Sequence, residues 1–446
     1  VPSISTESVD LIVHARWVLG AQDSHALLDE HCVVIKGDRI IDVMPSDEAA
    51  KLYNAASEIS LAEHVLMPGM VNAHGHAAMS LLRGAADDLL LKSWLEDYIW
   101  PLEGRWVAAE YVYHGTQLAI AEMLLSGTTC FADMYFFPDE SARAASEIGM
   151  RAQMACPIID FPTAWAQDSE EYISKATALN DQYRHHPLIS VAFGPHAPYT
   201  VSDAPLLKIA TFAEELDIPI HMHVHETAQE VSDALASSGK RPMQRLAELG
   251  LISPRLLCVH GTQLNEADIA LLGDNGASVV HCPESNLKLA SGFCPVAQLQ
   301  AAGVNVALGT DGAASNNDLD MFAEMRTAAL LAKAVAGDAS ALPALQALRM
   351  ATINGAKALG LDSQIGSLEA GKCADMIAVR MNSLNSLPLY NPLSQLVYST
   401  ASHQVSHVWV GAKLLVDGGA LTSIDVDQLR SNVQVWQQRI QKDTLS

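Results

Sequence analysis

From about Glu63 to Leu368 the chain alternates short apolar runs with amphipathic segments of helical length. This alternation is typical of repeated strand–helix units whose strands lie parallel in one sheet. Eight such runs read VLMPGMVNAH, GTTCFADM, RAQMACPII, LISVAFGPH, IPIHMHVH, LLCVHG, ASVVHC and VNVALGTD. They predict an α/β fold of the (β/α)8 barrel type, in which the carboxyl ends of the strands meet at one mouth. An open doubly wound sheet is disfavoured, because no G-x-G-x-x-G follows the first run.

The two ends of the chain have a different texture. Short strand-like runs separated by turn residues extend from Val9 to Ile59, and ADMIAVR and SHVWVGAKLLVDGG near the C-terminus are similar. We therefore predict one small β-sandwich domain built from residues 1–62 and 368–446, with a barrel of residues 63–367 between them. Spaced apolar residues from Ile424 to Thr444 predict a terminal amphipathic helix.

Charge and cysteine content limit which classes of partner and which cellular compartment we expect for this chain. The 446 residues include 51 acidic and 27 basic side chains, and the net charge of −24 disfavours nucleic acid and anionic membranes as partners. The chain has no apolar run of the roughly 18 residues that span a bilayer and no basic, then apolar N-terminus, so we expect a cytoplasmic protein. The seven cysteines lack C-x-x-C spacing, which argues against disulfides and a cysteine zinc site.

Histidine and aspartate side chains gather at the predicted carboxyl ends of the apolar runs. The positions are His74, His76, His196, His223, His260, His281 and Asp311. In an H-x-H pair on a strand both side chains point to one face, so two imidazoles can reach one cation at about 2.0–2.1 Å. A third histidine and an aspartate from other strand ends then predict a metal site with an open position. Its predicted ligands are His74, His76, His223 and Asp311.

The run HMHVHE contains three histidines with period two, and spacing alone leaves each of them a candidate ligand. Glu226 favours His223, because an acid one turn beyond the ligand can deliver a proton beside activated water. His221 would then orient a ligand or pack, and His225 would line the pocket. The alternative for Glu226 is a structural salt bridge.

Two further side chains suit proton transfer. Asp311 precedes GAASNN, a turn of small residues where backbone can approach a substrate, and its carboxylate can both bind metal and accept a proton from water. His260, in LLCVHGT, is suited to contacting that water. The alternative for either one is a rim residue that caps a helix.

Seven motifs resemble the amidohydrolase superfamily over nearly the whole chain. They are MPGMVNAHGH (67–76), GPHAPYT (194–200), HMHVHET (221–227), HGT (260–262), HCPESNLKLASG (281–292), GTDGAASNN (309–317) and GSLEAGKCADM (366–376). The most similar branch contains the deaminases of 5′-methylthioadenosine and S-adenosylhomocysteine and their chlorotriazine-hydrolase relatives. His196 stands where members with two metals have a bridging lysine or acid. The resemblance therefore implies one divalent metal, Zn2+ by default, with Fe2+ or Mn2+ as alternatives.

The resemblance implies a small-molecule substrate, an adenine nucleoside that is hydrolytically deaminated at C6. Glu226 would protonate the adjacent ring nitrogen, Asp311 would accept the proton of the water, and His260 would stabilise the attacking oxygen. His196 would hydrogen-bond the substrate near the reacting centre.

Three further residues are assigned to the rest of the substrate. Glu103 matches the acid that binds the ribose hydroxyls in the resembling deaminases, a reasonable role for a carboxylate. Trp94 would pack on the base or the sulfur substituent, with a core aromatic as the alternative. Arg151, in GMRAQ, would meet the carboxylate of a homocysteine substituent, with a surface arginine as the alternative.

Other functions stay open on the same scaffold. Dechlorination of a triazine, an N-ethylammeline-type hydrolysis, and deamination of guanine or cytosine all use the same metal chemistry, because fold and metal do not choose the leaving group. A different class of function is a non-catalytic, metal-free assembly protein. The sequence leaves open whether the chain forms a homo-oligomer.

Overall fold

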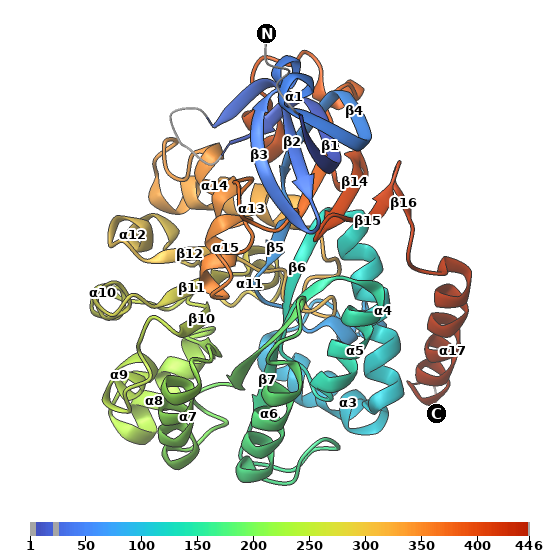
Figure 1. The fold of residues 1–446 in the computed structure, drawn as a ribbon. Coiled ribbons are helices and arrows are strands. Elements are labelled where there is room, and N and C mark those ends of the chain that lie inside the picture. The colour runs from blue at the N-terminus through green and yellow to red at the C-terminus, as the bar shows by residue number, and fades with distance from the viewer. Residues whose placement is uncertain (1–5, 21–25, 445–446) are drawn as a thin grey trace.

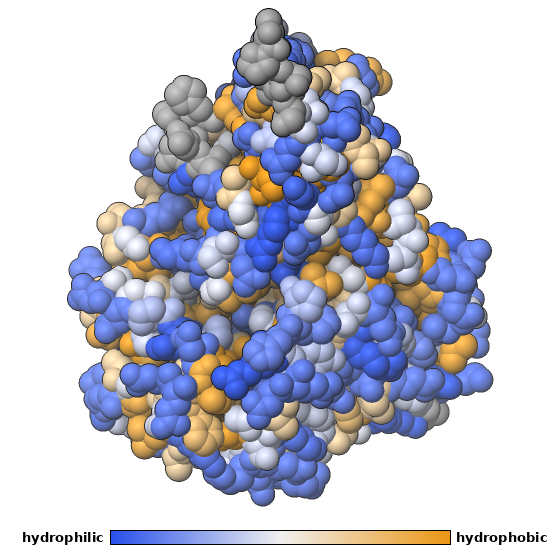
Figure 2. Space-filling view, viewed as in Figure 1, coloured by the Kyte–Doolittle hydropathy of each residue, from blue (hydrophilic) through white to orange (hydrophobic). Residues whose placement is uncertain are grey.

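The computed structural model describes residues 6–20 and 26–444, and it has the predicted α/β architecture. In Figure 1 a sheet that contains strands from both ends of the chain lies above a barrel surrounded by helices. The face seen in Figure 2 is largely hydrophilic, with apolar residues in small separate areas.

The barrel consists of eight parallel strands in the order β12-β11-β10-β9-β8-β7-β6-β5. Their bounds are β5 Met70–Asn72, β6 Thr128–Asp133, β7 Arg151–Ile158, β8 Ile189–Pro195, β9 Ile220–Val224, β10 Leu256–His260, β11 Ser278–His281 and β12 Asn305–Leu308. The backbone N–H of Ala73 donates to the carbonyl of Leu308 at 2.9 Å, which links the first and last strands. Small apolar side chains such as Val71, Cys130 and Ala307 belong to one buried cluster, so the barrel has a packed core rather than a pore.

Helices cover the outside of the barrel (Figure 1). The helices between β5 and β13 are α2 Leu91–Ser93, α3 Trp100–Trp106, α4 Ala109–Leu125, α5 Pro138–Ile148, α6 Ser169–Tyr183, α7 Asp203–Leu216, α8 Ala228–Ser238, α9 Pro242–Glu248, α10 Glu266–Asp274, α11 Pro283–Lys288, α12 Val296–Ala301, α13 Met321–Ala336, α14 Ala344–Met350 and α15 Ile353–Ala358. Their apolar faces and the strands form the largest buried cluster, which includes Phe131, Phe193 and Phe322. Within the described ranges, no helix is long and apolar enough to cross a membrane.

The second sheet joins the two ends of the chain, as predicted. Its strand order is β16-β15-β14-β13-β4-β1-β2-β3. The bounds are β1 Glu7–Leu19, β2 Leu27–Lys36, β3 Arg39–Pro45, β4 Tyr53–Pro68, β13 Met376–Arg380, β14 Val405–Val410, β15 Lys413–Asp417 and β16 Ala420–Leu421, with α1 Ser46–Leu52 and α16 Pro392–Tyr398 beside them. β13 pairs with β4 antiparallel, and Met376 lies opposite Pro68.

The first predicted run is divided between the two sheets at Gly69. β4 ends at Pro68 and β5 begins at Met70. A Cβ at Gly69 would lie 2.0 Å from the Thr129 hydroxyl oxygen, so only glycine allows the chain to pass from one sheet to the other at this point.

The terminal helix α17, Val426–Thr444, is also present as predicted, and it packs beside α4 (Figure 1). The indole of Trp436 donates to His114 at 3.1 Å. The domain limits at residues 62 and 367 remain a proposal. Strand β4 continues the sandwich sheet to Pro68. Residues 1–5, 21–25 and 445–446 lie outside the described ranges.

Candidate metal centre and active site

Four side chains from distant parts of the sequence meet at the mouth of the barrel. The Nε2 atoms of His74 and His223 lie 3.3 Å apart. One carboxylate oxygen of Asp311 lies 3.6 Å from Nε2 of His74 and 3.3 Å from Nε2 of His76. Both H-x-H histidines lie in the loop after β5, because that strand ends at Asn72, so the premise that they share a strand face was wrong.

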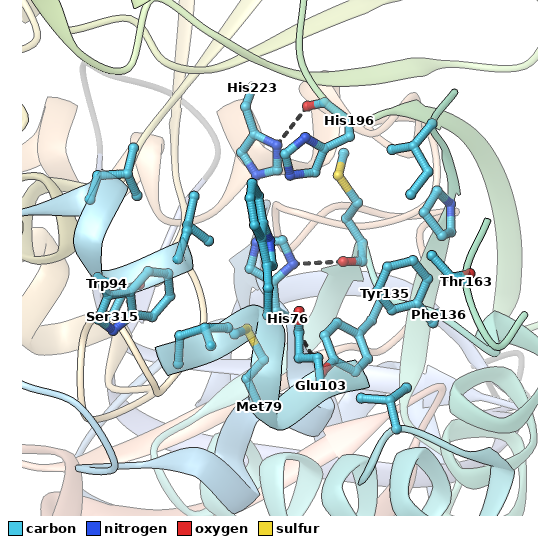
Figure 3. A pocket seen from close by; sticks show the side chains of 18 of the residues that line it. His76, Met79, Trp94, Glu103, Tyr135, Phe136, Thr163, His196, His223 and Ser315 are labelled. Atoms are coloured by element: carbon cyan, nitrogen blue, oxygen red, sulfur yellow. Dashed lines mark hydrogen bonds between the residues drawn. The ribbon is translucent and has the colours of Figure 1, made fainter. Parts of the chain in front are cut away.

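The other ring nitrogens of these histidines are already engaged. Nδ1 of His76 lies 2.6 Å from the Met134 carbonyl, and Nδ1 of His223 lies 2.7 Å from the His196 carbonyl (Figure 3). A carbonyl can only accept, so each Nδ1 carries the proton and each Nε2 presents a lone pair to the centre. This is how backbone carbonyls orient histidine ligands around a metal, and the donor set fits a divalent cation.

Burial keeps the imidazoles of His74 and His223 in the neutral form that binds metal. Desolvation lowers the pKa of His74 to about 4, and the pKa of His223 lies well below its ordinary value for the same reason. For Asp311, burial raises the pKa, but the interaction with His74 and with the nearby His76 and His260 rings outweighs burial and holds the pKa well below its ordinary range. Neutral imidazoles and an ionised carboxylate are the forms that coordinate a cation.

The Asp311 carboxylate is fixed by its surroundings. The hydroxyl of Ser285 donates to one oxygen at 2.7 Å, and the backbone N–H of Gly312 donates to the other at 2.7 Å. Asp311 itself has a φ of 63°, a left-handed conformation that is uncommon for an aspartate. Such backbone strain is typical of residues held in place by a functional site.

Glu226 lies beside this cluster as an acid without a close partner. Its carboxyl oxygen is 3.8 Å from Nε2 of His260, which is too long for a hydrogen bond. Burial, and then the charge of Asp311, raise the pKa of Glu226 to about 8. The side chain is therefore mostly protonated at neutral pH and can donate a proton.

Glu230, which sequence reasoning missed, positions Glu226. Its two carboxylate oxygens accept from the backbone N–H groups of His225 at 2.9 Å and Glu226 at 2.8 Å. Thr227 caps α8 by accepting from the N–H of Glu230. The signal was present as T-A-Q-E, a Thr-x-x-Glu pattern that marks helix starts.

His260 is held by Asn286, a second residue that was quoted in a motif without a role. Nδ1 of His260 lies 2.9 Å from the Asn286 amide oxygen, so Nε2 faces Glu226 and the cluster of predicted ligands. Burial lowers the pKa of His260, which keeps the ring neutral. His260 also groups with His74 and His223 as a possible metal triad.

A cavity of about 290 Å3 opens onto these residues. Its volume is close to the lower limit of the usual range for small-molecule binding sites. Among the predicted substrate contacts, Glu103, Trp94 and His196 line it. Glu103 accepts a hydrogen bond from the Tyr135 hydroxyl at 2.7 Å, and burial raises the pKa of Glu103 to about 7. Figure 3 shows His76 between the histidines on one side and Glu103 on the other.

Trp94 and His196 are anchored at the cavity wall. The indole of Trp94 donates to the Ala86 carbonyl at 3.2 Å, and the ring is 5% exposed, so it is both a core aromatic and a wall of the cavity. Nδ1 of His196 lies 3.1 Å from the Thr200 hydroxyl.

Arg151 is not at this site, and its assignment to a substrate carboxylate was wrong. It begins β7, at the opposite end of the barrel, and it is absent from the cavity lining. Its guanidinium makes two hydrogen bonds to Asp375, at 2.8 and 3.1 Å, and a third to the Pro187 carbonyl. The pattern G-M-R-A-Q fits a strand start in either location, which is why the sequence did not separate the two.

Three other histidines, His221, His225 and His281, are buried. Nε2 of His221 lies 2.9 Å from Nδ1 of His74, so His221 contacts a predicted ligand. His225 does not line the cavity; its ring contacts the Gln263 carbonyl and the N–H of Met243. His281 is buried at the end of β11, and burial lowers its pKa to about 3.

Comparison with known proteins places this geometry in a family. The sequence profile of the amidohydrolase family matches residues 65–415. The chain belongs to the amidohydrolase family. Members of that family are metal-dependent, which agrees with the His/Asp cluster of this chain.

Two close relatives and one distant structure sharpen the comparison. A 5-methylthioadenosine/S-adenosylhomocysteine deaminase of Saccharophagus degradans is 55% identical over 98% of both chains. A zinc-bound structure described as an adenosine deaminase of Xanthomonas campestris is 50% identical, covers 98% of this chain and 100% of its own, and superposes with a TM-score of 0.97. Atrazine chlorohydrolase of Arthrobacter aurescens, at 23% identity and a TM-score of 0.89 over 96% of this chain and 99% of its own, shares the amidohydrolase fold.

Proposed function

We propose that this amidohydrolase hydrolytically deaminates adenine nucleosides, converting the 6-amino group to a carbonyl oxygen and releasing ammonia. The observation that carries the proposal is Glu226, a buried carboxyl with a raised pKa, in the same cavity as the ligand cluster and Glu103. An acid at one end of a cavity and a hydroxyl-binding carboxylate at the other match a ring that must be protonated and a ribose that must be held. The names of the close relatives support the same substrate class.

We infer that His74, His76, His223 and Asp311 hold one divalent ion, with Zn2+ as the expected metal. When bound, such an ion supplies Lewis acidity that ionises water near neutral pH.

The residues of the chain carry the proton transfers. Glu226 donates its proton to N1 of adenine as water adds to C6, and Asp311 accepts the proton that the water loses. The neutral ring of His260, fixed by Asn286, hydrogen-bonds the attacking oxygen. Return of one proton to the amino group lets ammonia leave as the C6 carbonyl forms, so water and nucleoside give ammonia and the inosine-type product.

The test is an ultraviolet-monitored screen of methylthioadenosine, adenosylhomocysteine, adenosine, guanine and a chlorotriazine, with zinc-loaded protein and with protein treated with a chelator. We expect conversion of at least one adenine nucleoside to its hypoxanthine product, loss of that activity on chelation, and its return with Zn2+. Turnover of only the triazine or only guanine would refute the proposal. Absence of all turnover with fully metallated protein would favour a non-catalytic role.

A further inference from the structure

The ionisable side chains of the described cavity lining include no permanent cation. Apart from its histidines, the ionisable side chains that line it include three carboxylic acids, Glu103, Glu226 and Asp311. None of the described lining residues is a lysine or an arginine. Arg151, the cation expected from the sequence, is committed to Asp375 at the other end of the barrel.

Nearby basic residues also do not reach the lining. Lys92 and Arg105 lie on the segment that forms one wall, yet neither lines the cavity. Lys288 forms ion pairs or hydrogen bonds with Asp87 and Asn317. A substrate carboxylate in the outer cavity would therefore find no lysine or arginine among the described lining residues to pair with it.

The walls beyond Glu103 are apolar. One wall comes from residues 91–107 and includes Leu91, Leu95 and Trp100; the other follows β7 and includes Phe161 and Ala164. Trp100 is 39% and Phe161 46% exposed, so the outer part of the cavity presents aromatic surface toward solvent. In Figure 3 Phe136 and Thr163 lie on the side of the pocket opposite Trp94.

These features separate the possible 5′ substituents of a bound nucleoside. With the adenine at the metal cluster and the ribose at Glu103, the 5′ group extends between the apolar walls. An alkylthio group gains from burying its carbons there. A carboxylate there must lose water without gaining an ion-pair partner.

We propose that this site selects adenine nucleosides with a neutral, apolar 5′ substituent, such as alkylthio groups, and discriminates against substituents that carry a carboxylate, the homocysteine tail included. This inference rests on the proposed deaminase function and narrows its substrate. Residues of the two walls determine the specificity, and the exposed Ala164 on one wall is a position at which a cation can be introduced.

A charge series of substrates tests the inference. Four 5′-thio adenosines differ only in the tail: butylthio is neutral, aminopropylthio carries an ammonium, carboxyethylthio carries a carboxylate, and adenosylhomocysteine carries both. We expect kcat/KM for the carboxyethylthio compound and for adenosylhomocysteine to be at least about tenfold below that for the butylthio compound, because the carboxylate loses water at the apolar walls without gaining an ion-pair partner.

A pair of variants at one position provides the matched control. Ala164 is exposed at the cavity wall, so a longer side chain is accommodated without disturbing the core. Ala164→Arg should raise kcat/KM for adenosylhomocysteine relative to butylthioadenosine by about fivefold or more, whereas Ala164→Met, of similar length without charge, should not.

The outcomes separate this inference from the proposed function. Equal kcat/KM for all four tails, or equal ratios for the two variants, would overturn the charge discrimination while deaminase activity stands. No deamination of any of the four by zinc-loaded protein would overturn the function itself, and the discrimination with it.

Discussion

Both ends of the barrel bury ionisable side chains, but these side chains differ in their hydrogen bonding. At the amino end, Arg151 and Asp375 satisfy each other through two hydrogen bonds, and the N–H of Gly411 donates to the same carboxylate at 2.7 Å. At the carboxyl end, Glu226 faces His260 at 3.8 Å and keeps its proton. Saturated pairing indicates a structural role, and a buried acid left without a close partner indicates chemistry.

The largest effect that this contrast predicts is at Glu226. Glu226→Gln keeps the shape and removes the transferable proton, so kcat should fall by about 10^2 to 10^4. The protein should still fold, because the wild-type carboxyl is mostly neutral at pH 7. Steady-state kinetics on methylthioadenosine measures the loss.

Metal content is the control for that variant. Glu226 is outside the ligand set, so elemental analysis should find the same zinc per chain as in the wild type. A variant that retains kcat within about threefold would remove Glu226 from the role of acid.

Arg151 should show the opposite pattern. Arg151→Met leaves the Asp375 carboxylate, 1% exposed, without its partner, and the free energy of unfolding should fall by about 3–5 kcal/mol. kcat/KM per folded molecule should stay within about twofold, since the residue is remote from the cavity. Urea unfolding followed by fluorescence gives the first quantity.

The double variant sharpens the result. Arg151→Met with Asp375→Leu removes both charges, and it should recover a large part of the lost stability. If instead Arg151→Met changed only the activity toward adenosylhomocysteine, the assignment of this pair to structure would fail.

The same contrast explains what sequence reasoning reached. The barrel and the gathering of the predicted ligand residues followed from strand periodicity and from chemistry at strand ends, because in a closed barrel those ends must meet. The prediction for Arg151 was wrong because its partner, Asp375, is 224 residues away in the sequence, and no local pattern connects the two residues. Glu230 and Asn286 were missed for a related reason: each acts through another residue, on a backbone N–H or a ring nitrogen, and only coordinates reveal that contact.

Glu230 gives a prediction of intermediate size. Glu230→Gln replaces one accepting oxygen by a donor that faces a backbone N–H, so the segment that carries Glu226 should shift. We expect kcat to fall by about tenfold with KM and zinc content little changed, because small displacements of an acid are costly. Glu266→Gln, an exposed carboxylate on α10, is the matched control. A change in KM alone would mean that Glu230 shapes the cavity rather than positions the acid.

The smallest effect concerns pH and the ribose. Burial raises the pKa of Glu103 to about 7, so its ionised, hydroxyl-accepting form increases as pH rises through that value. KM for methylthioadenosine should therefore be roughly fivefold to tenfold higher at about pH 6 than at about pH 8. The 2′,3′-dideoxy analogue has no hydroxyls to donate, so its KM should lack this rise; an equal rise for both compounds would point to histidine protonation instead.

Tyr135 decides whether Glu103 is the titrating group. Its hydroxyl donates to Glu103 at 2.7 Å and lowers the pKa of that carboxyl, in opposition to burial. In Tyr135→Phe burial acts without that opposition, so the KM transition should move to higher pH, while kcat at saturating substrate changes little. If the transition stays at the same pH, Glu103 is not the titrating group, and its contact with Tyr135 is structural, as the pairing of Arg151 is. The buried groups available for chemistry would then be Glu226 and the predicted metal ligands alone.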